Sequence, residues 1–207
     1  MLFHSSDHGD NLSAALYALK TKKQFCDITI ITDEGELIAA HKNVLSSTCL
    51  YFEAMLNGNF KDGASNTVRI RNICYQTLHE CINFLYTGDI SITEDNVFEL
   101  LESSVFLQIE WIKEKCCSYL IRIMTVDNCL DILNIAENFS CDNLYQSAFI
   151  YVARNFSRII LKPGFLNISL KLVSKAFFIC TNFFINILYK FKKNKKIFFI
   201  IFYRILN

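Results

Sequence analysis

Residues 25–58 read FCDITIITDEGELIAAHKNVLSSTCLYFEAMLNG, and this stretch decides the fold class. Apolar and β-branched residues fill 25–31, a second short apolar run covers 36–39, and Asp33-Glu34-Gly35 lies between them. Two such runs around a glycine-containing turn predict a β-hairpin. Between residues 42 and 56 the apolar spacing changes to that of short helices. The stretch therefore predicts a hairpin followed by paired helices.

The chain on both sides of this stretch predicts further helices and one more strand. Upstream, apolar residues at helical spacing end near Lys22, and downstream the alternation of Thr67–Arg71 indicates a third strand. Helical periods then follow one another, and Thr87-Gly88-Asp89 is a clear stop signal. The expected helices cover 75–87, 93–106, 109–123, 127–138 and 142–155. A small sheet with helices packed over it is an α+β arrangement.

Charge is distributed unevenly along the 207 residues. Met1–Asp142 holds 10 Lys/Arg against 20 Asp/Glu, whereas Asn143–Asn207 holds 11 Lys/Arg and no acid. An acidic body lacks the clustered cations that neutralise phosphates, so we expect no nucleic-acid partner. The first residues, MLFHSSDHGD, have neither the cationic nor the apolar region of a signal peptide. Nine scattered cysteines without a CxxC pair fit free thiols, and together these features predict a cytoplasmic protein.

Signals for catalysis or a cofactor are weak. His4, His8, His41 and His79 are scattered, and no phosphate-binding glycine loop or GxSxG motif occurs. The pairs His79-x-Cys81 and Cys116-Cys117 lack the spacing of a zinc finger, and adjacent helical cysteines point about 100° apart. We therefore expect a non-enzymatic protein without a metal or cofactor.

Several long motifs together resemble the BTB/POZ family of protein-interaction domains. These are the quoted stretch, with its Phe-Cys-Asp, Ala-His-Lys and Tyr-Phe-x-Ala-Met segments, and 78–120, LHECINFLYTGDISITEDNVFELLESSVFLQIEWIKEKCCSYL. Farther on, NCLDILNIAE and ARNF resemble the start of the BACK domain of Kelch-type adaptors. The resemblance implies a BTB/POZ domain over residues 1–123 and a partial, helical BACK-like segment over 124–174.

The remaining residues, 175–207, form a tail rich in Phe, Ile, Lys and Asn that contains no Gly, Pro or acid. The chain is most similar to poxviral Kelch-like proteins, but Trp111 is the only tryptophan and no glycine- and tryptophan-rich propeller blades follow. We interpret the tail as frameshift-derived, in a truncated gene of an AT-rich genome. Its apolar blocks are shorter than the ~20 residues that span a bilayer, so we expect no membrane span and an aggregation liability.

Two interaction sites follow from the resemblance. Leu12, Ala15, Leu16 and Leu19 form an apolar stripe that, in the family, packs across a two-fold dimer interface. Phe60, Lys61 and Asp62, with Leu107 and Gln108, occupy positions that dock on a cullin ubiquitin-ligase scaffold, and the resemblance suggests the third cullin paralogue. The family places Glu where this chain has Asp62, one methylene shorter. An aromatic that closes a loop beside a solvated acid is an equally weighted alternative.

Asp27, His41 and Lys42 form a third group of candidate residues. A charge on a strand of a small core needs a partner, and in the resembled fold Asp27 and Lys42 lie near each other. We favour a structural polar cluster with His41 over a ligand pocket, because buried paired charges are usually structural.

Three functional hypotheses remain open. The favoured one is a dimeric adaptor that engages a cullin scaffold and, without a propeller, acts as a decoy in the cytoplasm, that of a host cell if the protein is viral. The second is an oligomeriser that titrates other BTB proteins into homo- or heterodimers. The third is an inactive gene remnant whose product is unstable.

Overall fold

The computed structural model describes Met1 and residues 4–56 and 66–159. The chain divides into two compact units, Met1–Tyr119 and Leu120–Asn207. The first unit holds a small sheet with helices around it, and the described part of the second is helical. The predicted α+β architecture is confirmed.

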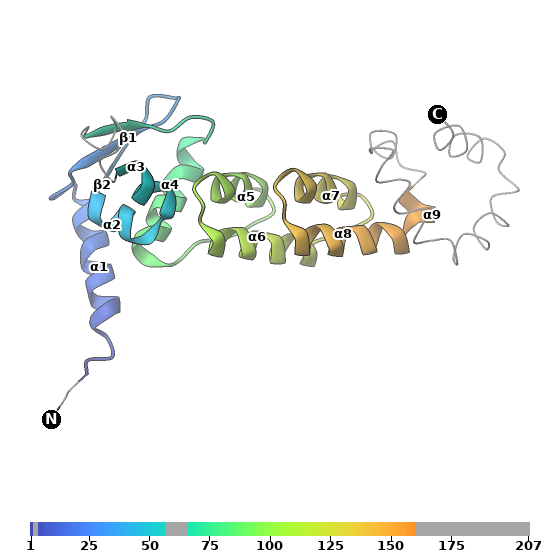
Figure 1. The fold of residues 1–207 in the computed structure, drawn as a ribbon, viewed down its shortest axis with the longest axis horizontal. Helices are drawn as coiled ribbons and strands as arrows, with labels where there is room; N and C mark the ends of the chain where they lie inside the picture. The colour runs from blue at the N-terminus through green and yellow to red at the C-terminus, as the bar shows by residue number, and fades with distance from the viewer. Residues whose placement is uncertain (2–3, 57–65, 160–207) are drawn as a thin grey trace, which may run out of the picture. The chain divides into compact units, whose positions relative to one another are not determined.

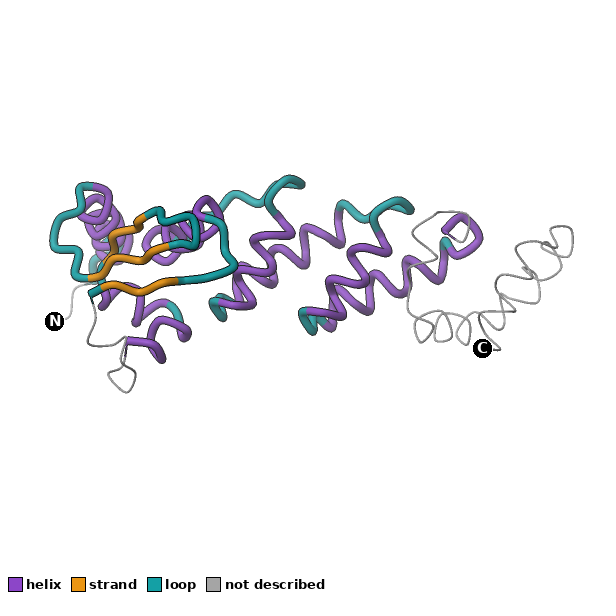
Figure 2. Tube along the Cα trace, turned by 90° about the horizontal axis from the view of Figure 1, so that it is seen from above, coloured by secondary structure: helices purple, strands orange, loops and turns teal. Residues whose placement is uncertain are grey.

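Three strands form the sheet of the first unit, in the order β2-β1-β3. β1 (Ile28–Ile31) pairs antiparallel with β2 (Leu37–Ala40) and parallel with β3 (Thr67–Arg69). Figure 2 shows the strands of this sheet side by side. Alternate side chains are buried, among them Ile30, which lies opposite Ile38 and Val68. This period of two is the one that the sequence of the hairpin predicts.

Six helices belong wholly or mostly to the first unit among the described residues (Figure 1). They are α1 (His8–Thr21), α2 (Lys42–Thr48), α3 (Leu50–Leu56), α4 (Tyr75–Thr87), α5 (Val97–Phe106) and α6 (Glu110–Arg122). α4 is the central helix, because it packs against α1, α2 and α5. Its fully buried side chains Leu78, Cys81 and Ile82 lie in the core of the unit.

Two helices of the first unit end in a Schellman motif without glycine. At the end of α1 the backbone N–H of Gln24 donates to Leu19 and that of Lys23 to Lys20, with Lys23 at φ 54°. At the end of α5 the N–H of Ile109 donates to Ser104 and that of Gln108 to Val105, with Gln108 at φ 56°. A left-handed residue is what this motif requires, and glycine normally supplies it. α4 alone of these three ends at a glycine, Gly88, with φ 74°.

The described part of the second unit contains α7 (Cys129–Asn138), α8 (Asp142–Arg154) and α9 (Phe156–Ile159), shown in Figure 1. α7 and α8 pack against each other as a helical hairpin with Leu133, Ala136 and Leu144 buried. α7 also ends in a Schellman motif, with Ser140 at φ 51°. The α7–α8 pair therefore repeats the local design of α5–α6: a helix of 10 residues, a left-handed polar residue, and a helix of 13.

α5 begins later than the sequence predicts. The helix starts at Val97 rather than at Thr93, because the side chain of Asn96 accepts the Thr93 N–H at 2.8 Å and donates to the Ser91 carbonyl at 2.9 Å. These bonds hold 91–96 as a turn in front of the helix. Asparagine commonly competes with the helix in this way, so it favours positions at or before a helix start.

Candidate interaction surfaces

The outer face of α1 carries the apolar stripe that the sequence predicts. Leu12 is 52% exposed and Ala15 is exposed, whereas Leu16 and Leu19 are half-buried. α1 packs on α4, and its buried residue is Lys20 in the last turn. Leu12 and Ala15 thus lie open to a partner, and Leu16 and Leu19 sit at the edge of the contact with the body.

Lys20, in the last turn of α1, is a buried residue that the sequence analysis did not single out. Its ammonium donates to the side-chain oxygen of Asn83 at 2.7 Å and lies over the rings of Tyr17 and Tyr86, 5.8 and 5.7 Å from their centroids. Burial lowers the pKa of Lys20, and the nearby Cys26 raises it by a smaller amount. A lysine on a helix face usually keeps its ammonium group in water, so the sequence pattern gave no signal for this buried contact.

His41 connects the end of α1 to α4. Its backbone N–H donates to the Tyr86 hydroxyl at 2.8 Å, and its ring Nδ1 lies 2.9 Å from the same oxygen. Its Nε2 lies 2.9 Å from the Gln24 carbonyl and 3.7 Å from the Cys26 sulfur. Burial is the largest cause that raises the pKa of Tyr86, to about 12.

Asp27 and Lys42 lie beside this contact without forming an ion pair with each other. A carboxylate oxygen of Asp27 accepts the backbone N–H of Lys42 at 2.7 Å, at the start of α2. The Lys42 ammonium instead donates to the Asn66 side chain at 3.3 Å. Asp27 is exposed, so its carboxylate binds a helix start at the surface, where an anion is favoured. The expectation of a charge inside the core does not fit this geometry, because Asp27 keeps access to water.

An aromatic surface spans α3 and α5 of the first unit. Phe106 is 44% exposed, and its ring lies 5.1 Å from that of the half-buried Tyr51. Tyr51 also meets the fully buried Phe52 edge-on at 5.4 Å, and its neighbour Leu50 is 63% exposed. We call Leu50, Tyr51 and Phe106 the α3–α5 surface. The sequence indicated a cullin contact at Phe60–Asp62 and in part of the 97–108 helix region, but it did not single out Leu50, Tyr51 or Phe106.

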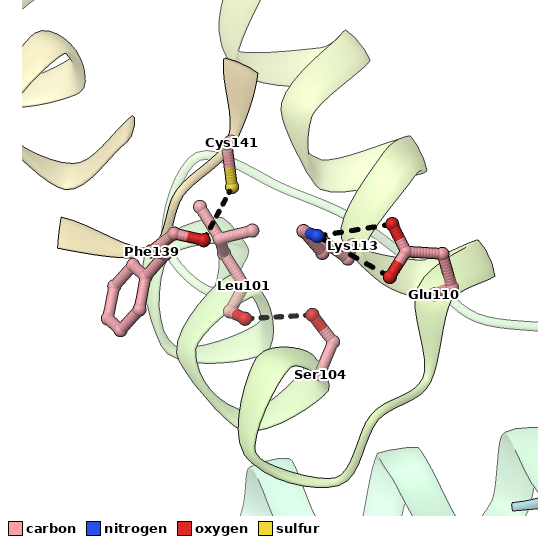
Figure 3. A network of polar contacts seen from close by, with 6 residues as sticks. All are labelled: Leu101, Ser104, Glu110, Lys113, Phe139 and Cys141. Atoms are coloured by element: carbon pink, nitrogen blue, oxygen red, sulfur yellow. Dashed lines mark hydrogen bonds and ion pairs between the residues drawn. The ribbon is translucent and has the colours of Figure 1, made fainter. Parts of the chain in front are cut away.

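The turn between α5 and α6 shows where Leu107 and Gln108 lie. Leu107 is fully buried, and its carbonyl accepts a hydrogen bond from the Cys49 thiol at 3.1 Å, so its side chain is part of the core rather than of the surface. Gln108 is exposed at the left-handed position. Short-range bonds frame this turn in Figure 3: the Ser104 hydroxyl donates to the Leu101 carbonyl at 2.8 Å, and Lys113 pairs with Glu110 at 3.1 Å. Phe60, Lys61 and Asp62 lie outside the described residues.

A second aromatic contact lies on α4 and α6. The rings of Phe84 and Trp111 stack at 5.1 Å, and the Lys115 ammonium lies 5.2 Å from the Trp111 ring centroid. Trp111 remains 47% exposed. Trp111 is thus a second exposed aromatic side chain of the first unit, with the Lys115 ammonium over its ring.

The thiols of Cys49, Cys81 and Cys129 are poorly suited to nucleophilic chemistry. Burial is the largest cause that raises the pKa of Cys81 to about 12 and of Cys129 to about 11, and burial also raises the pKa of Cys49. A thiol nucleophile needs the opposite shift, toward the thiolate. Within residues 4–56 and 66–159, no three His, Cys, Asp or Glu side chains gather as a metal site requires.

The geometry defines a domain of one small sheet and surrounding helices, followed by a helical hairpin. The BTB/POZ domain model matches residues 16–124, more than half of the chain, and the BACK model ("BTB And C-terminal Kelch") matches residues 129–177. The chain belongs to the BTB/POZ domain family. The resemblance that the sequence motifs indicate is thereby confirmed.

Curated relatives are Kelch-like proteins. Human Kelch-like protein 2 is 34% identical over 155 residues, which are 75% of this chain and 26% of that protein. Zebrafish (Danio rerio) Kelch-like protein 21 is 31% identical over 169 residues, 82% of this chain and 27% of that protein. The chain therefore spans about a quarter of the length of these relatives.

The BTB domain of zebrafish PATZ1 is a structural neighbour. It superposes with a TM-score of 0.52 at 22% identity, over 58% of this chain and 97% of that domain. This likeness shows the fold. In the part of the chain that the structure describes, no helix has both the length and the hydropathy that a bilayer crossing requires.

Proposed function

We propose that the chain is a non-enzymatic, cytoplasmic adaptor that self-associates through α1 and binds a cullin ubiquitin-ligase scaffold through the α3–α5 surface and the turn after α5. Membership of the BTB/POZ family and similarity to Kelch-like proteins support an interaction role. A chain of these residues alone would occupy the scaffold without a substrate-receptor propeller, and so act as a decoy.

The observation that carries the cullin proposal is the exposure of Leu50 and Phe106 around Tyr51. Tyrosine is among the residues enriched in binding hot spots, and Tyr51 lies against the exposed Phe106 ring and follows the exposed Leu50 in the chain. α3 ends at Leu56, shortly before Phe60, Lys61 and Asp62 in the chain. We therefore include those three residues in the proposed site, with the third cullin paralogue as the partner.

Gln108 and Leu107 have different parts in this proposal. Gln108 is exposed and can donate and accept hydrogen bonds, so it is the residue of the turn that contacts the partner. Leu107 is buried and holds the turn in place together with the Cys49 thiol. Replacing Leu107 would therefore affect binding through the fold.

Titration of the intact chain with the amino-terminal domain of the cullin, by calorimetry or biolayer interferometry, tests the proposal. Leu50→Ala is expected to weaken binding by about tenfold, or about 1.4 kcal/mol, which exceeds the loss at most interface residues. Leu37→Ala is the matched control, because Leu37 is 59% exposed, close to the 63% of Leu50, but lies on β2. Equal affinities for the two variants would remove the α3–α5 surface from the proposal, and no binding by the unmutated chain at tens of micromolar would end it.

A second candidate function is capture of other BTB proteins in heterodimers. The exposed Leu12 and Ala15 favour it, because the same stripe serves a second copy or a related partner. Affinity purification distinguishes the two functions by partner identity. Recovery of BTB proteins without a cullin supports capture, and recovery of a cullin that is lost in Leu50→Ala supports the adaptor.

A further inference from the structure

The hydrogen bonds of His41 fix where its ring proton resides. The Gln24 carbonyl can only accept, so the Nε2 atom, 2.9 Å away, must be the donor. In the neutral imidazole the other nitrogen, Nδ1, is then an acceptor, and the Tyr86 hydroxyl at 2.9 Å donates to it. The Tyr86 oxygen in turn accepts the His41 backbone N–H at 2.8 Å. Every ring position of the neutral histidine is satisfied.

Both ends of this arrangement reach the last turn of α1. Gln24 is the residue whose N–H closes the Schellman motif of α1 on Leu19. Lys20, one turn earlier, is buried against the ring of Tyr86 and bonded to Asn83 of α4. His41 therefore contacts the segment just after α1 through the Gln24 carbonyl, and the Tyr86 ring contacts α1 itself at Lys20 and Tyr17.

We infer that the His41–Tyr86 pair is a proton-sensitive latch that seats the last turn of α1 on the domain. The latch is closed while the imidazole is neutral. A proton added at Nδ1 removes the acceptor of the Tyr86 hydroxyl proton, and that buried donor then lacks a partner. The ring of the same tyrosine lies beneath the Lys20 ammonium, which bonds an amide and two rings rather than a carboxylate. Acid therefore opens the contact between α1 and α4.

The surrounding ionisable groups come from every element packed on the latch. They are Lys20 and Tyr17 of α1, Cys26 and Asp27 after it, Lys42 of α2, and His79 and Tyr86 of α4. Asp27 is the carboxylate of this group, and it is exposed and bonded to the Lys42 backbone. His79 is the other histidine, and it shares Asn83 with Lys20. The latch is independent of the proposed self-association, because it rests on contacts within one chain.

Hydrogen–deuterium exchange of the full chain tests the latch. Peptides from α1 and α4 are compared between about pH 7.5 and about pH 5.5, with rates corrected for intrinsic exchange. We expect the protection of residues 19–24 to fall by about tenfold relative to α4, the effect of one lost buried hydrogen bond. His41→Asn, which keeps an acceptor but cannot titrate, should abolish this fall, and His79→Gln should retain it.

The alternatives are separated by these two variants. A fall that persists in His41→Asn and disappears in His79→Gln assigns the effect to His79 and overturns the latch. An equal fall in α1 and α4 would mean that acid unfolds the whole unit, which also overturns it. Tyr86→Phe supplies a further check, because removal of the hydroxyl should lower α1 protection at neutral pH and reduce its dependence on acid.

Discussion

Asn96 and Asn128 hold the starts of α5 and α7 with the same pair of side-chain hydrogen bonds. The Asn96 oxygen accepts the Thr93 N–H at 2.8 Å and its nitrogen donates to the Ser91 carbonyl, while Asn128 accepts from Thr125 at 2.7 Å and donates to Ile123. Each asparagine has an αR backbone just before its helix. The pairs α5–α6 and α7–α8 therefore share the same asparagine turn before the first helix and a residue in the same left-handed conformation after it.

Asn128→Ala should lower the free energy of unfolding by about 1 kcal/mol, because it removes both bonds that shape the start of α7. Equilibrium denaturation monitored by circular dichroism measures the change. Asn138→Ala is the control, since Asn138 is exposed at the last position of α7 and alanine favours a helix. A loss in Asn138→Ala as large as that in Asn128→Ala would contradict the role given to the Asn128 side chain.

Gln108→Gly tests separately how Gln108 affects the stability of the turn and whether its side chain contacts the cullin. A non-glycine residue at φ 56° is strained, so glycine there should raise the free energy of unfolding by up to about 1 kcal/mol. The melting temperature measures this gain, and Ser140→Gly should show a similar one at the end of α7. If Gln108 contacts the cullin, Gln108→Gly binds more weakly despite its greater stability. A more stable variant with unchanged affinity would exclude the Gln108 side chain from the site.

The hairpin and the helical order could be predicted because each follows from a period in the sequence. Ile28 and Ile30 alternate with half-buried residues on β1, and Leu78, Ile82 and Leu85 recur along one side of α4. Helix ends were less predictable. Gly88 gave a signal at the end of α4, but Lys23, Gln108 and Ser140 adopt the same left-handed conformation without one.

The residues that build the candidate sites were predicted only in part. Leu12 and Ala15 were singled out because apolar residues recur there at helical spacing, and their exposure was read only from the structure. Lys20 was missed because its burial depends on Asn83 and Tyr86, which are distant in sequence. Phe106 follows the apolar residues of α5, and sequence alone does not tell an exposed aromatic from a buried one.

Alkaline pH should destabilise the first unit. Burial raises the pKa of Cys81 from 9.0 to about 12 and that of Tyr86 from 10.0 to about 12. Each group stabilises the folded unit fully below its pKa in the unfolded chain. This stability is lost as pH rises toward 12, because between the two pKa values the group ionises in the unfolded chain but not in the folded one. Lys20, whose pKa burial lowers, acts in the opposite sense. The urea concentration at the midpoint of unfolding should fall between about pH 8 and about pH 11, and it should fall less steeply in Cys81→Ala. A midpoint that does not change with pH would contradict the burial argument.

Leu12→Asp should convert a self-associating chain to monomer while leaving it folded. Leu12 is 52% exposed within one chain, so the aspartate stays hydrated in the monomer. At a two-fold interface the same change places two carboxylates near each other and removes them from water, which opposes association. Leu16→Asp is the less selective variant, because Leu16 is half-buried against the body and the charge also disturbs the fold.

Light scattering of the full chain, with circular dichroism at the same concentration, measures the effect of Leu12→Asp. Leu37→Asp is the control: Leu37 is exposed to a similar extent, 59% against 52% for Leu12, but lies on β2 rather than on α1. We expect a dimer for the unmutated chain and for Leu37→Asp, and a folded monomer for Leu12→Asp. A folded monomer for the unmutated chain would refute self-association outright. A dimer that survives Leu12→Asp would place the interface on another face, because an apolar contact centred on α1 does not tolerate a buried, unpaired carboxylate.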